Sequence, residues 1–350
     1  MPDLRLSVLD QSPISEGMEP AQALHNTLDL ARHCDALGYH RYWLAEHHGT
    51  PMLACASPEA LIGPIAAATE RIRIGSGGVM LPHYSPLKVV ETFSILSGLY
   101  PGRIDLGLGR APGTDQMTML ALQRDRRQAA PDDFAQQLAE LLAYLEDDLP
   151  RNHPFARLAA TLPGLPERPE PWLLGSSPQS AIWAGELGLP YSFADFINSQ
   201  GAEIAADYRR RFVDSERLPA PRLSVGVLAI CAESDEDAER LAASSRMAFS
   251  LLRQGQLIPL PPADKALRYL ETRQRRSGGS SRRAVYGTPE TVRAGIEQVA
   301  REYQAEEVVL LTNVYEHGAR RHSYELIAEV FGLTPPGSQR GPVAAASDST

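Results

Sequence analysis

The sequence contains few cysteines. Only three of its 350 residues are cysteine, and Cys34, Cys55 and Cys231 are too widely separated to form a CxxC pair. A sparse and odd number of cysteines argues against a disulfide framework and is typical of reduced thiols. We therefore expect a cytoplasmic protein.

Long apolar runs and a basic surface are also missing. No stretch reaches the roughly 18 uninterrupted apolar residues of a membrane helix, and residues 1–12 lack the pattern of a signal peptide. The formal net charge is −9, whereas nucleic acids and anionic membranes favour basic partners. We expect neither a nucleic-acid partner nor a membrane partner.

The composition is that of a globular protein with a large core. Apolar residues make up 43% of the chain and charged residues 22%, close to globular averages. A single α/β barrel typically needs ~250 residues plus insertions, so this chain has an ordinary length for one.

Short apolar segments alternate with amphipathic ones along the chain, which predicts repeated βα units and a parallel sheet. About eight strands can be counted, which favours closure into a single-domain (β/α)8 TIM barrel with insertions. The expected strands are 4–9, 41–45, 72–81, 104–108, 172–174, 191–193, 223–231 and 307–311. The expected helices are 20–38, 57–70, 86–100, 117–149, 178–187, 204–212, 234–252, 289–303 and 323–331.

Three segments depart from this alternation. Residues 150–171 are rich in proline and predict little regular structure, and residues 254–284 are interpreted as an exposed insertion. Residues 335–350 are small, polar and proline-containing, so we expect a disordered tail after a barrel that spans 1–334.

Polar residues follow the second strand as Glu46, His47 and His48. Active sites of barrels lie at the carboxyl ends of the strands, which draws attention to this position. A polar loop is one interpretation. A metal site is disfavoured, because adjacent histidines on an extended chain point to opposite sides and no HxH or HExxH pattern is present. We favour His47 as a general base or proton donor.

Glycines and an arginine mark the ends of the third and fourth strands. Gly77 and Gly78 indicate either a close approach by a flat ligand or a plain bulge, and spacing does not distinguish the two. Residues 107–113 have the spacing GxGxxxG instead of GxGxxG, which argues against a dinucleotide site. Arg110 is placed either to meet an anionic ligand or to form a structural ion pair.

A further strand leads through Gly175 and several serines into a helix. Free N–H groups and the positive end of the helix dipole make such a helix start a phosphate site. Ser176, Ser177 and Ser180 are the candidate contacts. A serine that only caps the helix is the alternative.

Taken together, these loops resemble those of the bacterial-luciferase-like family of flavin-dependent monooxygenases. The matching segments are 42–48, 72–86, 100–110, 173–177 and 285–289, and the resemblance spans about residues 4–330. It implies a barrel that binds reduced FMN, lets the flavin take up O2 as a C4a-peroxide, and oxygenates a small organic substrate. It also implies a separate NAD(P)H:flavin reductase and the homodimer that is common in the family.

The resemblance also assigns residues. His47 matches a histidine that assists the oxygen chemistry, and Gly77 and Gly78 match a non-proline cis peptide under the flavin ring. Arg110 matches an arginine near the flavin or its phosphate, and the three serines match the phosphate-binding helix start. No metal ligand is implied.

Two positions differ from the family pattern. Gly109 stands where bacterial luciferase has a reactive cysteine, so light emission is not expected, and Asp195 stands where relatives tend to have histidine. An F420-dependent hydride-transferring oxidoreductase and a non-catalytic flavin-binding barrel remain alternatives, with a metal-dependent hydrolase more distant. The sequence does not identify the substrate.

Overall fold

The computed structural model describes residues 4–110, 114–123, 125–127, 132–215, 217–274 and 283–333. The expected disordered tail therefore lies outside the described residues. Eight parallel strands close into a barrel, because β9 pairs with both β7 and β1. These strands are β1 (Arg5–Asp10), β2 (Arg41–Leu44), β3 (Arg73–Met80), β4 (Ile104–Gly109), β5 (Glu170–Gly175), β6 (Tyr191–Ala194), β7 (Leu223–Cys231) and β9 (Glu307–Leu311). The predicted (β/α)8 barrel is confirmed.

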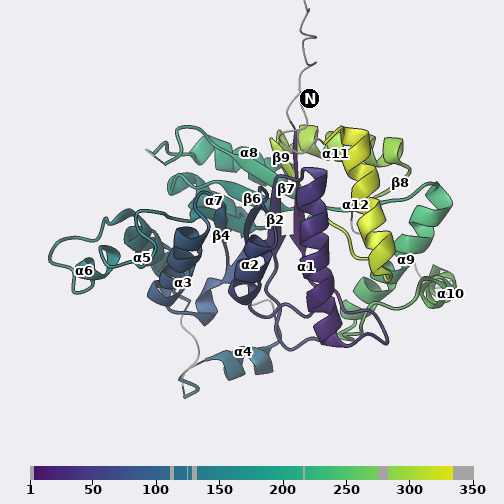
Figure 1. Cartoon of the computed structure of the whole chain (residues 1–350), viewed down its shortest axis with the longest axis horizontal. Coiled ribbons are helices and arrows are strands. Elements are labelled where there is room, and N and C mark those ends of the chain that lie inside the picture. Colours follow the sequence, from purple (N-terminus) through teal and green to yellow (C-terminus); the bar gives the residue numbers. More distant parts are fainter. Residues whose placement is uncertain are drawn as a thin grey trace, which may run out of the picture.

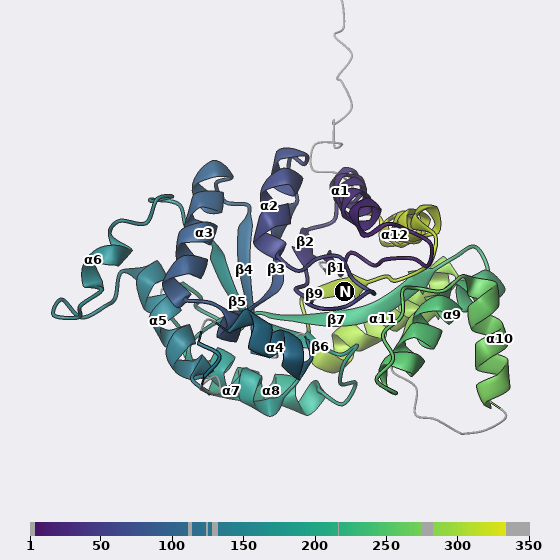
Figure 2. The same cartoon turned by 90° about the horizontal axis from the view of Figure 1, so that it is seen from below.

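Helices surround the ring of strands (Figures 1 and 2). They are α1 (Pro20–Leu37), α2 (Pro58–Ala67), α3 (Pro86–Leu99), α4 (Gln116–Leu122), α5 (Phe134–Glu146), α6 (Ala156–Ala159), α7 (Pro178–Glu186), α8 (Ala202–Arg211), α9 (Asp235–Leu252), α10 (Ala263–Gln274), α11 (Pro289–Tyr303) and α12 (His317–Phe331). Figure 2 looks onto the barrel from the end where α4 lies, which is the carboxyl end of the strands. None of the helices in the described part of the chain has the length and apolar character that crossing a bilayer requires.

A buried ion network fills part of the barrel interior. The guanidinium of Arg41 is 1% exposed and donates to Asp105 Oδ2 at 2.8 Å, to Glu307 Oε1 at 2.9 Å and to Glu170 Oε2 at 3.0 Å. It also lies 4.7 Å from the ring centroid of Trp172. The network connects residues at the start of β2, β4, β5 and β9. It therefore stabilises the end of the barrel opposite the carboxyl ends of the strands.

One sequence prediction about a helix needs correction. The long helical stretch expected over 117–149 contains two helices, α4 and α5, and Pro131 lies between them in the sequence. Proline lacks a backbone donor, so a continuous helix through this position is disfavoured. No residue of α4 is buried, whereas α5 buries an apolar face that includes Leu138 and Leu141.

The segment 254–284 was interpreted as an exposed insertion. It contains α10, and Ala266 of this helix is buried against Ala243 and Met247 of α9. The apolar residues of α10 therefore pack against α9, and this part of the segment is an ordered helix on the barrel. The short strand β8 (Val285–Gly287) was not predicted; it pairs with the far end of β7, outside the closed barrel. Residues 150–171 contain the one-turn helix α6.

Candidate active site

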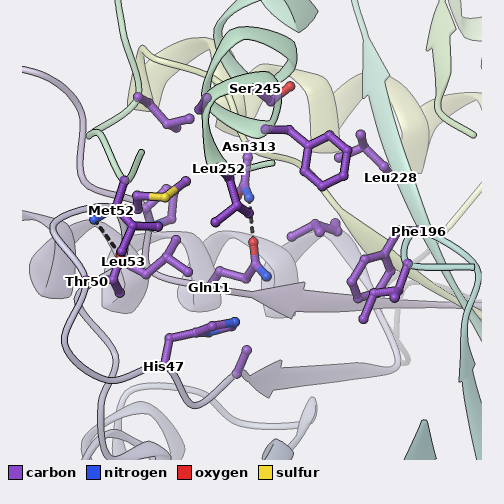
Figure 3. A pocket seen from close by; sticks show the side chains of 18 of the residues that line it. Gln11, His47, Thr50, Met52, Leu53, Phe196, Leu228, Ser245, Leu252 and Asn313 are labelled. Atoms are coloured by element: carbon purple, nitrogen blue, oxygen red, sulfur yellow. Dashed lines mark hydrogen bonds between the residues drawn. The ribbon is translucent and has the colours of Figure 1, made fainter. Parts of the chain in front are cut away.

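A cavity of about 1450 Å3 opens at the carboxyl ends of the strands. Residues that follow β1, β2 and β9 line one side of it, and residues of α9 line another. In Figure 3, His47 lies on the opposite side of the cavity from Ser245 and Leu252 of α9, with Gln11 between them. The cavity exceeds the ~300–1,000 Å3 of a typical small-molecule site, so it has room for two ligands together.

His47 follows β2 and lines this cavity. Its backbone N–H donates to the carbonyl oxygen of Cys55 at 2.9 Å, which fixes the loop, and its Nδ1 is buried without a hydrogen-bond partner among the described residues. Burial, with a smaller contribution from the neighbouring His48, lowers the pKa of His47 to about 4. The imidazole is therefore neutral at physiological pH.

Glu46 is a buried carboxylate that organises the loop around His47. It accepts hydrogen bonds from the Met80 backbone N–H at 3.0 Å and from the Tyr84 hydroxyl at 2.9 Å, and its Oε1 lies 2.6 Å from His48 Nε2. Burial and the Glu46 carboxylate both raise the pKa of Tyr84, so its phenol stays protonated and acts as a donor. These contacts join the end of β2 to the end of β3.

Gly77 and Gly78 lie within β3, and the bond between them is a cis peptide, as the resemblance implied. A Cβ on Gly78 would lie 2.7 Å from the carbonyl oxygen of Gly107, which is too close for any side chain. The pairing of β3 with β4 shifts register between Gly77 and Val79. Contact with the neighbouring strand therefore suffices to explain Gly78, while Gly77 also lines the cavity.

The start of α7 carries the predicted serines. The Ser177 hydroxyl accepts the backbone N–H of Ser180 at 3.4 Å and so caps the helix. The Ser180 hydroxyl donates to the Ser177 carbonyl at 2.8 Å and lies 2.9 Å from the Tyr191 hydroxyl. The Arg110 guanidinium lies 5.6 Å from the ring centroid of Trp183, also on α7. The Arg110 guanidinium therefore lies beside α7, the helix whose start carries the serines.

The predicted site residues do not all meet in the cavity. Its described lining includes His47 and Gly77 but not Gly78, Arg110, Ser176, Ser177 or Ser180. The second group lies along the same carboxyl edge of the barrel, at β3, β4 and β5. The Asn198 side chain joins the two regions, because its Nδ2 donates to the Ser176 carbonyl at 3.1 Å and both of its neighbours, Ile197 and Ser199, line the cavity.

Gln11 and Asn313 are cavity residues that the sequence interpretation missed. Asn313 Nδ2 donates to Gln11 Oε1 at 2.7 Å (Figure 3). Gln11 directly follows β1 and Asn313 lies two residues after β9, so these two side chains and His47 come from three adjacent strands. The sequence signal that could have identified Gln11 and Asn313 is their position just after predicted strands.

Asp195, where the chain differs from the family pattern, is fully buried after β6. Its Oδ1 accepts from the Tyr303 hydroxyl at 2.8 Å and lies 3.5 Å from Arg283 Nε, while its Oδ2 has no partner within the part of the chain that the structure describes. Burial raises the pKa of Asp195, and Tyr303 and Arg283 oppose that rise. Asp195 positions Arg283, which lines the cavity.

Solved structures share this fold. The crystal structure of apo-MsnO8 has a TM-score of 0.85 and 40% sequence identity, and covers 95% of this chain and 99% of its own. The oxygenating constituent of 3,6-diketocamphane monooxygenase from Pseudomonas putida, in complex with FMN, has a TM-score of 0.70 at 17% identity, covering 95% and 98%. An F420-dependent secondary alcohol dehydrogenase has a TM-score of 0.64 at 16% identity, covering 94% and 99%. The last two show the fold alone.

Relatives in sequence identify the family of the chain. A luciferase-like monooxygenase of Escherichia coli K12 is 41% identical over 330 residues, which cover 93% of this chain and 97% of the relative. The N-acetyl-S-alkylcysteine monooxygenase of Bacillus subtilis 168 is 36% identical over 330 residues, covering 93% and 98%. The model of the luciferase-like monooxygenase family matches residues 4–306. The chain therefore belongs to the luciferase-like monooxygenase family.

Proposed function

We propose that this protein is a flavin-dependent monooxygenase, which uses reduced FMN and O2 to oxygenate a small organic substrate. The observation that carries the proposal is the neutral imidazole of His47, with a buried Nδ1, in a large cavity at the barrel mouth. Membership of a monooxygenase family supports it, as does a relative named for the oxygenation of N-acetyl-S-alkylcysteine.

The residues at the mouth fit FMN. In this proposal the phosphate binds at the start of α7, where the helix dipole, the hydroxyls of Ser176, Ser177 and Ser180 and the nearby Arg110 favour an anion. Gly77, which lines the cavity, and its neighbour Gly78 would hold the ring system. The FMN complex of the diketocamphane enzyme supports this choice of cofactor. Reduced flavin, when bound, supplies the activation of O2.

His47 acts in this proposal as a proton acceptor at the reacting centre. A pKa of about 4 keeps the imidazole unprotonated at neutral pH, so a role as base is favoured over a role as cationic proton donor. Glu46 and Tyr84 hold the loop in place through their hydrogen bond of 2.9 Å.

We also propose how the flavin is reduced. The described residues form one barrel, and residues 107–113 lack the GxGxxG spacing of a dinucleotide site, so we assign reduction of the flavin to a separate NAD(P)H:flavin reductase. The three cysteines are free and buried, which fits a reducing cytoplasm. A homodimer is the assembly we expect from the family.

F420-dependent hydride transfer is the second candidate, because an F420-dependent alcohol dehydrogenase shares the fold. Titration of the purified protein with FMN and with F420, followed by absorbance, tests the cofactor. Oxygen uptake in the presence of a flavin reductase, NADH and a panel of organic compounds tests the reaction. Tight F420 binding without FMN binding, or uptake that no compound stimulates, would refute the monooxygenase.

A further inference from the structure

We propose that the side-chain amide of Gln11 donates a hydrogen bond to a carbonyl oxygen of the substrate, which is therefore an apolar compound with a neutral carbonyl group. This inference rests on the proposed monooxygenase function, since it concerns the substrate of the same cavity. It follows from the orientation of the Gln11–Asn313 pair, from the buried groups that hold this pair in place, and from the apolar side chains beside it.

The hydrogen bond from Asn313 determines which end of the Gln11 amide is open to a ligand. Asn313 Nδ2 donates to Gln11 Oε1 at 2.7 Å, and both side chains line the cavity (Figure 3). Gln11 Nε2 has no acceptor among the described residues and is not fully buried, whereas Asn313 Oδ1 is fully buried. The open group of the pair is therefore an N–H donor, which requires an acceptor on the ligand.

A single buried arginine supports both members of the pair. Arg320, which is 2% exposed, donates through Nε to the Thr312 carbonyl at 2.8 Å and through Nη2 to Asp10 Oδ1 at 2.7 Å. Asp10 directly precedes Gln11 in the sequence, and Thr312 directly precedes Asn313. The ends of β1 and β9 are therefore held together before a ligand arrives. Such preorganisation lowers the entropy lost on binding.

Apolar side chains lie next to the pair in the cavity wall. Leu9 is two residues before Gln11, Leu311 is two residues before Asn313, and both leucines line the cavity. Residues two apart on an extended chain face the same side, so each amide continues an apolar row. A donor in such surroundings costs free energy when a bound ligand leaves it unpaired. Ligands that place no acceptor at Gln11 are therefore disfavoured.

The chemistry of the pair favours a carbonyl over other oxygen groups. A hydroxyl group needs an acceptor for its own proton, and the open end of this pair offers only a donor. A carboxylate loses its hydration on entry, and one neutral donor among leucines does not offset the desolvation of a charge. A neutral carbonyl oxygen needs only the donor that Gln11 presents.

The order of the strands separates this donor from the proposed flavin site. The ring of strands runs β3, β2, β1, β9. Gly77, which we propose to hold the flavin ring, belongs to β3, whereas the amide pair follows β1 and β9. His47 follows β2 and therefore comes between them in this order. A compound bound at Gln11 thus extends past His47 towards the flavin.

Calorimetry with matched compounds tests the proposal. The protein, with and without oxidised FMN, is titrated with N-benzylacetamide, with N-hexylacetamide and with the thioamide of each. An amide and its thioamide share one apolar body and nearly one shape, but sulfur is a weaker hydrogen-bond acceptor than oxygen. We expect an amide to bind about three- to tenfold more tightly than its thioamide, the range of one hydrogen bond between neutral groups.

Variants assign the preference to Gln11. Gln11→Glu retains an acceptor for Asn313 but has no N–H group, and Gln11→Met has neither. Both are expected to remove the preference for amide over thioamide and to leave FMN affinity intact. Gln254→Met is the matched control, because Gln254 also lines the cavity but its Nε2 already donates to the Ser250 carbonyl at 2.7 Å. It should retain the full preference, and circular dichroism confirms that each variant is folded.

The outcomes separate the two proposals. Equal affinities for amide and thioamide in the unmodified protein, or no binding of either amide up to its solubility limit, overturn the inference even if the variants fail to fold. Variants of Gln11 that keep the preference, or that lose FMN affinity instead, also overturn it, since the donor would then be unused or would serve the cofactor. A protein that prefers the amides but binds no FMN supports the carbonyl site and contradicts the proposed monooxygenase.

Discussion

The pKa of His47 allows a test that needs no knowledge of the substrate. Burial holds this pKa at about 4 in the folded protein, whereas an unfolded histidine titrates near ~6.5. As the pH falls, His47 therefore binds its proton at a higher pH in the unfolded chain than in the folded protein. The stability that depends on a neutral His47 is complete above pH ~6.5, declines as the pH falls, and reaches its minimum near pH 4.

The size of the effect follows from the two pKa values. Between pH 8 and pH 5, His47 alone is expected to reduce the free energy of unfolding by about 2 kcal/mol. Replacement of His47 by glutamine retains a polar side chain and removes this titration. The stability of the protein should therefore decline by about 2 kcal/mol more than that of His47→Gln over the same interval.

Two measurements examine this expectation. Urea unfolding of both proteins at pH 8 and pH 5 gives the difference in stability. The protonation of the other histidines contributes equally to both proteins and therefore cancels in the comparison. Long-range proton–nitrogen NMR follows the imidazole directly, with the variant providing the assignment. A midpoint above pH 6, or the same pH dependence in both proteins, would refute the reasoning that burial keeps His47 neutral.

Three further substitutions test other parts of the structure. His47→Ala should leave FMN affinity nearly intact and lower substrate-dependent oxygen uptake by ~100-fold or more; unchanged uptake would reduce His47 to a loop residue. Ser177→Ala should weaken FMN binding more than riboflavin binding in a fluorescence titration, because only FMN carries a phosphate, and equal losses would contradict the phosphate assignment. Arg41→Met should lower the free energy of urea unfolding by about 3–5 kcal/mol, because it removes the cation that is paired with the buried Glu307 carboxylate; a loss below ~1 kcal/mol would show that the network is dispensable.

Much of the barrel could be predicted because its strands are short apolar segments bounded by polar turns. The segment 223–231 shows this, since β7 is buried along its whole length and was predicted with its observed bounds. Tertiary contacts decided the cases that failed. β8 has only three residues, which carry no periodic signal, and forms because the end of β7 offers it a partner.

The sequence predicted residues of the candidate site only where a reactive side chain or a glycine lies at the end of a strand. His47 and Gly77 were found in this way, and both line the cavity. Ser245 and Leu252 of α9 also line the cavity and were missed, because the pattern of an amphipathic helix does not show which of its residues face a cavity. Which face of α9 turns towards the barrel mouth depends on packing against α10, through contacts such as that of Met247 with Ala266, and a single sequence does not reveal it.

The position of β9 in the ring has a consequence for synthesis of the chain. This strand joins β7 to β1, so the first strand made must wait for the last one before the ring is complete. Until residue 311 has left the ribosome, β1 and β7 each present an open edge of backbone donors and acceptors, the kind of edge at which chains aggregate. Any shortened product that stops before Glu307 retains both edges and is a natural target for chaperones and proteases.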